Sequence, residues 1–119
     1  MKIALDEVIQ QLPLPSTEKW PQGVWSTRAF AHGSMSLVLF TPRGRDYQSP
    51  HDQDEVYIVM QGTGEFVVEN ERFLFGPGDI LFVPAAKMHR FENFSDDLVT
   101  WVVFWGPRGG EKSKRSDET

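Results

Sequence analysis

The 119-residue chain contains no cysteine, only three histidines and two tyrosines, and no long uninterrupted run of apolar residues. Without cysteine, neither a disulfide framework nor a thiolate metal site is possible. A transmembrane helix needs about 20 consecutive, mostly apolar residues, and the segment Met1–Glu7 lacks the apolar core of a signal peptide. We therefore expect no membrane partner and a cytoplasmic location.

The chain also contains fewer positively than negatively charged residues. Twelve Lys and Arg residues stand against seventeen Asp and Glu residues, which gives a net charge of −5. An acidic chain without a basic cluster is poorly suited to a phosphate backbone, so no nucleic-acid partner is expected. A small anionic ligand remains compatible with this charge, because one inward arginine could pair with it. The length fits a single domain.

The apolar residues follow the alternating pattern of β-strands almost throughout. Only residues 4–12 have helical spacing, and two prolines end that segment, which predicts a short amphipathic helix. From residue 25 onward, short apolar segments alternate with Gly, Pro and Asn turn signals. The predicted strands are Trp25–Phe30, Met35–Thr41, Glu55–Met60, Gly64–Glu69, Glu71–Phe75, Ile80–Val83, His89–Phe94 and Leu98–Trp105. This pattern favours an all-β fold, an antiparallel β-barrel or jelly roll.

The same pattern predicts how the chain is organised. Residues 1–24 form an N-terminal helix and a connecting arm, and residues 25–107 form the β-barrel. Residues 108–119 contain no large apolar side chain and mix charges densely. Such a composition is typical of a mobile charged tail.

Three side chains within the strand region point to a metal site: His51, Glu55 and His89. Side chains alternate between the faces of a strand, so His51 and Glu55 share a face if the strand continues without a bulge. Two imidazoles and a carboxylate suit one divalent transition metal, namely Fe, Mn, Ni or Zn, and leave open positions for water or substrate. Taken singly, a histidine such as His32, in a predicted turn, is more often a satisfied polar group than a ligand.

The spacing of these residues resembles the two motifs of the cupin superfamily. The first motif has His, three residues, Glu, six residues and Gly, which match His51, Glu55 and Gly62. Ser49 occupies the place of the family's first histidine, so one usual ligand is missing. The second motif is matched by Gly78, Pro84, His89 and Asn93, with Ala86 replacing a glycine.

The resemblance implies a small single-domain cupin, of the cupin type 2 kind, with a mononuclear metal site in the barrel. It also implies dioxygenase, isomerase, epimerase or lyase chemistry on a small organic substrate, and a homodimer. Four further residues, Gln53, Tyr57, Ser49 and Phe91, are candidates for contact with the substrate or with the metal ligands. Gln53 has three interpretations: a weak fourth ligand, a hydrogen-bond donor to substrate, or a partner that orients His51.

Two rival functions follow from the same residues. The missing ligand at Ser49 favours a non-catalytic, metal-free module that binds or senses a metabolite. A third hypothesis is a metal-free enzyme in which His51 and His89 act as acid and base. Nine Phe, four Trp and four Met are more than so small a barrel can enclose, which independently favours a homodimer. The sequence identifies neither a substrate nor a reaction type.

Overall fold

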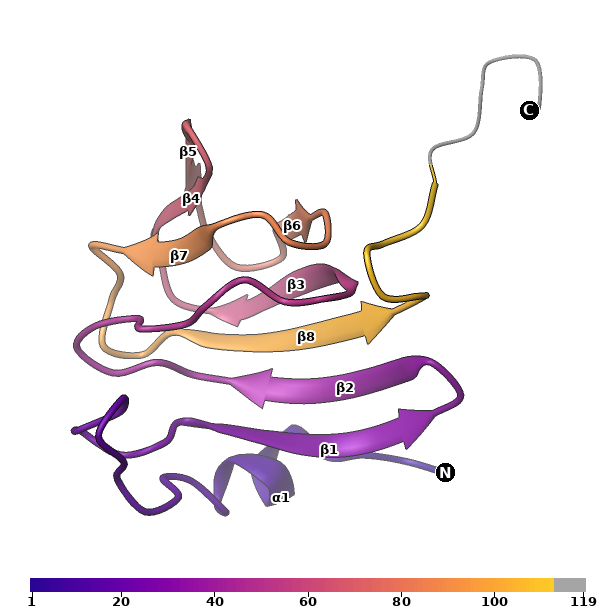
Figure 1. Ribbon diagram of the computed structural model, residues 1–119. Helices are drawn as coiled ribbons and strands as arrows, with labels where there is room; N and C mark the ends of the chain where they lie inside the picture. The colour runs from indigo at the N-terminus through magenta and orange to yellow at the C-terminus, as the bar shows by residue number, and fades with distance from the viewer. Residues whose placement is uncertain (113–119) are drawn as a thin grey trace.

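The structure, a computed structural model, describes residues 1–112. One short helix and eight strands lie in this part of the chain (Figure 1). The elements are α1 (Leu5–Ile9), β1 (Ser26–His32), β2 (Met35–Phe40), β3 (Asp54–Gln61), β4 (Gly64–Val68), β5 (Glu71–Phe75), β6 (Ile80–Val83), β7 (His89–Glu92) and β8 (Val99–Trp105). Each predicted strand is present, with bounds that differ by at most two residues.

The strands form two antiparallel sheets that face each other. The larger sheet has the order β1-β2-β8-β3-β6, and the smaller sheet has the order β5-β4-β7. Figure 1 shows β7 lying across from β3 and β8, with β4 and β5 behind it. Large apolar side chains from both sheets meet between them, including Tyr57, Phe66 and Phe91, all of which are buried. The predicted all-β jelly roll is confirmed.

The N-terminal helix is shorter than predicted. Helix α1 ends at Ile9, and beyond the C-cap residue Gln10 the backbone N–H groups of Gln11 and Leu12 donate to carbonyls only three positions earlier. Pro13 has no N–H with which to continue the helix and restricts the residue before it, so the last turn tightens and stops. Val8 of α1 packs with Leu39 and Val99 on the outer face of the larger sheet.

The start of the predicted tail packs against the barrel. The backbone N–H of Gly109 donates to the carbonyl of Asp52, and that of Glu111 donates to the buried carboxylate of Asp54. These two hydrogen bonds tie Gly109 to the loop before β3 and Glu111 to Asp54, the first residue of β3. Residues 113–119 lie outside the described residues. Among residues 1–112, no helix is both long and apolar enough to cross a membrane.

Candidate metal centre

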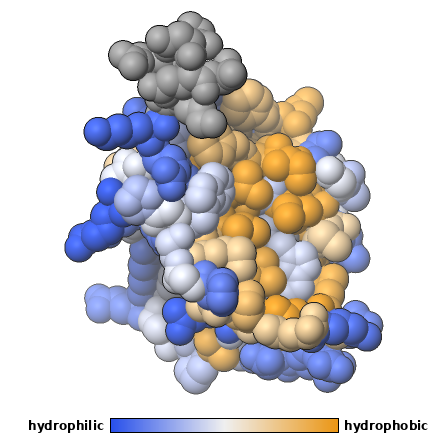
Figure 2. All heavy atoms as spheres, turned by 90° about the vertical axis from the view of Figure 1, so that its right-hand side faces the viewer, coloured by the Kyte–Doolittle hydropathy of each residue, from blue (hydrophilic) through white to orange (hydrophobic). Residues whose placement is uncertain are grey.

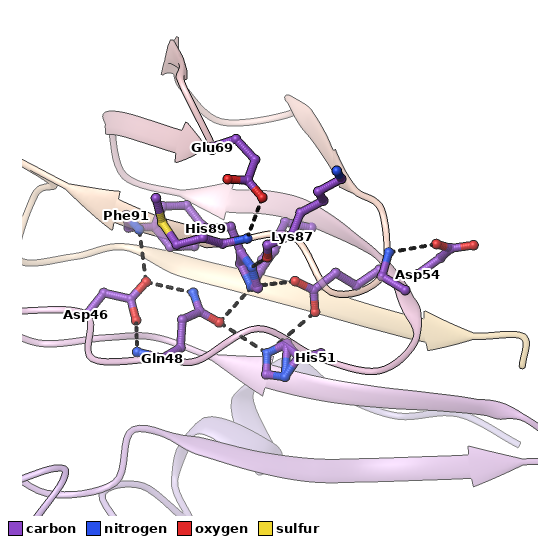
Figure 3. A network of polar contacts seen from close by, with 12 residues as sticks. Asp46, Gln48, His51, Asp54, Glu69, Lys87, His89 and Phe91 are labelled. Carbon is purple, nitrogen blue, oxygen red and sulfur yellow. Dashed lines mark hydrogen bonds and ion pairs between the residues drawn. The ribbon is translucent and has the colours of Figure 1, made fainter. Parts of the chain in front are cut away.

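His51, Glu55 and His89 come from three segments and their potential ligand atoms lie close together. Figure 3 shows the two histidines of this cluster. His51 lies in the loop before β3, Glu55 lies on β3, and His89 begins β7. One potential ligand atom from each residue lies within 4.8 Å of the others. Glu55 stands between the imidazoles: its Oε1 is 2.6 Å from Nε2 of His89, and its Oε2 is 3.6 Å from Nε2 of His51.

Because the cluster is largely buried, its polar atoms destabilise the fold unless a further group binds them. The side chains of Glu55 and His89 are each 1% exposed, whereas that of His51 is 35% exposed. Glu55 Oε2 and His89 Nε2 are buried and make no hydrogen bond, since the close approach of His89 to Glu55 lacks hydrogen-bond alignment. An unsatisfied buried polar atom costs about 1–3 kcal/mol. A cation held between them would satisfy both atoms, so the donor set fits a divalent metal.

The tautomer of His89 is fixed by a backbone carbonyl. Its Nδ1 lies 2.9 Å from the carbonyl oxygen of Lys87. A carbonyl oxygen can only accept, so Nδ1 carries the proton and donates it. In the neutral ring this leaves the lone pair on Nε2, directed at Glu55. Histidine ligands are oriented in the same way by outer partners in many metal sites.

The two histidines differ in their affinity for protons. Burial lowers the pKa of His51, and the opposing charge of Glu55 does not fully restore it. Burial also lowers the pKa of His89, but the adjacent Glu55 carboxylate, together with the Lys87 carbonyl and the charge of Asp46, outweighs burial, so the net pKa of His89 is raised. His51 is therefore more readily available as a neutral ligand, and a metal ion has to displace a proton mainly from His89.

The sequence analysis missed two residues that border the cluster, Asp46 and Gln48. Gln48 Oε1 accepts a hydrogen bond from the Tyr57 hydroxyl at 2.9 Å and lies 3.4 Å from Nε2 of His51. Gln48 Nε2 donates to the buried carboxylate of Asp46 at 2.7 Å. Both residues lie in an irregular loop, where polar residues are usually solvated. The only available signal was their position directly before Ser49.

Two of the other predicted residues border the cluster or support it from the core. The hydroxyl of Tyr57 lies 3.3 Å from Oε1 of Glu55, and burial raises its pKa well above the ordinary value, which keeps it a neutral donor. The ring of Phe91 packs against Phe66 in the core, and its backbone N–H donates to Asp46. Phe91 therefore supports the site from behind.

The remaining two predicted residues are directed elsewhere. The Ser49 hydroxyl accepts a hydrogen bond from Lys19 Nζ at 2.8 Å. The Gln53 side chain donates to the carbonyls of Ser34 and Gly106, so it does not reach the cluster, and the interpretations of Gln53 as a ligand or as the partner of His51 are wrong. The alternation of side chains fails there because residues 52 and 53 form a bend and β3 begins only at Asp54.

A cavity of about 330 Å³ opens beside His51. Its walls combine apolar and polar side chains, and the polar residues of the lining are Lys19, Ser26, Gln48, Ser49, His51 and Tyr57. No acidic side chain is among the residues that line it. Ligand pockets usually measure about 300–1,000 Å³, so this cavity suits a small organic molecule next to the candidate metal centre. The apolar lining residues include Trp20, Val38, Phe40, Val102 and Phe104.

Comparison with known proteins identifies the family. The sequence model of the Cupin domain family matches residues 36–105, more than half of the chain. The chain belongs to this family, and the predicted family relationship is confirmed. The matched residues contain both motifs and all three residues of the His51, Glu55 and His89 cluster.

Several individual proteins are similar to this chain. An uncharacterized protein of Streptomyces coelicolor is 42% identical over 74 residues, which cover 62% of this chain and 70% of that protein. Acireductone dioxygenase of Leishmania infantum is 35% identical over 83 residues, covering 56% of this chain but only 24% of the dioxygenase.

Solved structures share the fold. A cupin-2 domain protein of Shewanella frigidimarina matches 89% of this chain and 94% of its own, with a TM-score of 0.64 and 17% identity. The DMSP lyase DddQ of Ruegeria pomeroyi matches 68% of this chain and 46% of the lyase, with a TM-score of 0.60 and 23% identity. At these identities the likeness shows the fold alone.

Proposed function

We propose that this chain is a metal-dependent cupin enzyme that acts on a small organic anion, with His51, Glu55 and His89 holding one divalent transition metal. The observation that carries the proposal is the pair of buried atoms without hydrogen bonds, Glu55 Oε2 and His89 Nε2, which face the third member of the cluster. When bound, such a metal supplies Lewis-acid polarisation of a substrate oxygen. The fold positions the carboxylate and both imidazoles close together. The cavity beside them includes apolar side chains in its lining.

The charge of the cavity supports an anionic ligand. Lys19 is the only charged side chain in its lining other than the titratable His51, and among the described residues it forms no ion pair. The positive charge of Lys19 acts on the metal cluster. Burial is the main cause of the lowered pKa of His51, and the charge of Lys19 adds a smaller contribution in the same direction. A carboxylate on the ligand would pair with Lys19 and accept from Ser49, while an apolar body would lie against the aromatic walls.

Enzymatic activity is favoured over simple binding by the three-residue donor set, which leaves coordination positions open, as catalytic sites do. A dioxygenase among the proteins with similar sequences also supports it. The experiment is metal analysis of the purified protein, followed by a turnover screen of small organic acids with and without O₂. Near-stoichiometric metal with turnover supports the proposal. Protein that takes up no metal under any loading condition would contradict it and leave the metabolite-binding module in its place.

Lys19→Met should weaken the binding of small carboxylates about tenfold or more, because a hydrogen bond to a charged group contributes about 1.5–3 kcal/mol. Calorimetric titration with paired probes, a carboxylic acid and its uncharged primary amide of the same shape, measures the effect. Lys2→Met is the matched control, since it removes the same charge from an exposed position near the N-terminus. Equal binding of acids and amides to the unaltered protein would show that the cavity does not select anions.

A second copy of the chain is the proposed partner for an apolar surface on β5 and β6. This surface consists of Phe73, Leu74, Ile80 and Phe82, which are 44%, 85%, 59% and 53% exposed. Figure 2 shows apolar side chains gathered on one side of the face that it presents. β5 and β6 are the edge strands of their sheets. An exposed apolar edge invites pairing, and a two-fold axis brings identical patches together.

Phe82→Asp should convert this homodimer into a monomer, because each copy would bury an unpaired carboxylate in the apolar contact. Sedimentation equilibrium at tens of micromolar, roughly the range for a weak dimer, measures the change. Leu14→Asp is the control, since Leu14 is 38% exposed but lies on the N-terminal arm. An unaltered protein that sediments only as a monomer would rule out the dimer.

A further inference from the structure

We infer that the amide oxygen of Gln48 is a fourth protein ligand of the proposed metal and replaces the histidine that the chain lacks at Ser49; this inference rests on the proposed function. Ser49 does not fill the missing position, because its hydroxyl is engaged by Lys19 at 2.8 Å. The neighbouring residue does reach the cluster. Figure 3 shows the Gln48 side chain extending between Asp46 and His51.

The orientation of the Gln48 amide is set by Asp46. The Asp46 carboxylate is 5% exposed and accepts from three donors: the backbone N–H of Phe91 at 2.9 Å, the backbone N–H of Gln48 at 3.0 Å, and Gln48 Nε2 at 2.7 Å. An ionised carboxylate can only accept, so the NH₂ group of Gln48 must face it. The amide oxygen therefore has to face the opposite way, toward the cluster. This assignment follows from the hydrogen-bond network.

The amide oxygen has one acceptor position occupied and one directed at the cluster. Tyr57 donates its hydroxyl hydrogen to Gln48 Oε1 at 2.9 Å, and His51 Nε2 lies 3.4 Å from the same oxygen. Two atoms that bind one metal at about 2.0–2.2 Å lie about 2.8–3.6 Å apart for octahedral to tetrahedral angles. The distance between Gln48 Oε1 and His51 Nε2 falls within that range.

This ligand would change the chemistry of the metal. The usual family ligand at this place is an imidazole nitrogen, whereas an amide carbonyl is a neutral oxygen donor. Carbonyl and carboxylate oxygens suit Mn, whereas imidazole suits Zn, Fe, Ni and Cu. The set of two imidazoles, one carboxylate and one amide oxygen should therefore be less selective for Zn over Mn than a set with three imidazoles.

Cobalt(II) titration tests the inference, because the visible absorption of Co(II) reports the number and type of its ligands. Gln48→Leu should weaken Co(II) binding about tenfold or more and shift its absorption bands, since the loss of even an outer partner typically costs about 10–100-fold in affinity. Gln48→Glu keeps an oxygen of the same reach and should retain Co(II) binding, with bands that differ from those of Gln48→Leu because an oxygen ligand is still present. Gln61→Leu is the control, because Gln61 donates to the carbonyl of Asp97, outside the cluster.

Asp46→Asn tests the orientation separately. The Phe91 N–H and the Gln48 side-chain NH₂ donate to Asp46 Oδ2, and the Gln48 backbone N–H donates to Oδ1. Asparagine has only one amide oxygen, so its NH₂ must face one of these donors, and the contact that holds the Gln48 amide in its direction is lost or weakened. We expect Asp46→Asn to reproduce the Co(II) band shift of Gln48→Leu, although Gln48 itself is unchanged. A purely structural role for Gln48 would alter stability but leave the bands as they are.

The outcomes separate the two proposals. If the unaltered protein binds Co(II) and Gln48→Leu shows the same affinity and bands, Gln48 is not a ligand and the metal centre stands without it. If the unaltered protein binds no Co(II), the proposed function fails together with the inference. Should Gln48→Leu fail to fold, the Co(II) bands of Asp46→Asn still decide between a ligand and a structural role.

Discussion

Glu55→Gln should reduce metal affinity more than about 100-fold while leaving the fold intact, because glutamine keeps the size of the side chain but removes its charge. Loss of an outer partner typically costs about 10–100-fold, and loss of the central anionic ligand should exceed that. Glu55 is 1% exposed and lies within 3.6 Å of both imidazoles. His89→Ala should have a comparable effect, since it removes a ligand that is equally buried. Chelator competition with Co(II) or Zn(II) measures the dissociation constants.

Gln53→Ala is the internal control for this series. Gln53 precedes Glu55 by two residues but donates only to the carbonyls of Ser34 and Gly106. We therefore expect its removal to change stability and not metal affinity. If Glu55→Gln and Gln53→Ala weaken the metal equally, Glu55 is not a ligand. If the His89→Ala protein still binds one equivalent of metal, the metal site lies elsewhere.

Much of the fold follows from local patterns in the sequence. The strands β5 and β6 have the predicted bounds because turn residues flank each of them: Asn70 and Gly76 around β5, and Gly78 and Pro84 around β6. Period-two burial continues through β3, where Glu55, Tyr57 and Val59 are buried and the residues between them are less so. The motif spacing was informative for the same reason, since it places Glu55 and His89 on strands that face each other.

What the sequence could not predict lies in the loops. Asp46 and Gln48 lie in the loop between β2 and β3, so no periodicity indicates which way they point, and Asp46 is held by the backbone N–H of Phe91, 45 residues later. Gln53 was misplaced because a bend at residues 52 and 53 interrupts the alternation. Residues 109–111 were assigned to the tail because they lack apolar side chains, but backbone hydrogen bonds hold them instead.

The hydrogen bonds of the loop also bear on the missing ligand. A serine in place of a histidine, taken alone, favours loss of metal binding. In the structure, the change at Ser49 accompanies a polar loop in which Lys19 engages the serine and Asp46 orients Gln48. Substitution at one motif position is therefore a weak argument against a metal, because a neighbouring side chain can supply a donor to the same point.

Metal affinity should fall as the pH falls, in steps that reflect the two histidines. The metal binds neutral imidazole, so each bound proton competes with it. The pKa of His89 is raised above the ordinary value of about 6.5, and that of His51 is lowered below it. Above the pKa of His89, affinity should vary little with pH. Between the two pKa values one proton is displaced, which costs about tenfold in affinity per pH unit. Below the pKa of His51 the dependence should approach two protons.

The dissociation constant for Co(II), measured across about pH 5–8.5, gives these slopes directly. Titration at one pH in buffers of different ionisation enthalpy counts the displaced protons independently. His32→Ala is the matched control, because His32 is exposed at the end of β1 and should leave the profile unchanged. An affinity that does not vary with pH over the whole range would mean that no histidine binds the metal, and the centre on His51, Glu55 and His89 would have to be abandoned.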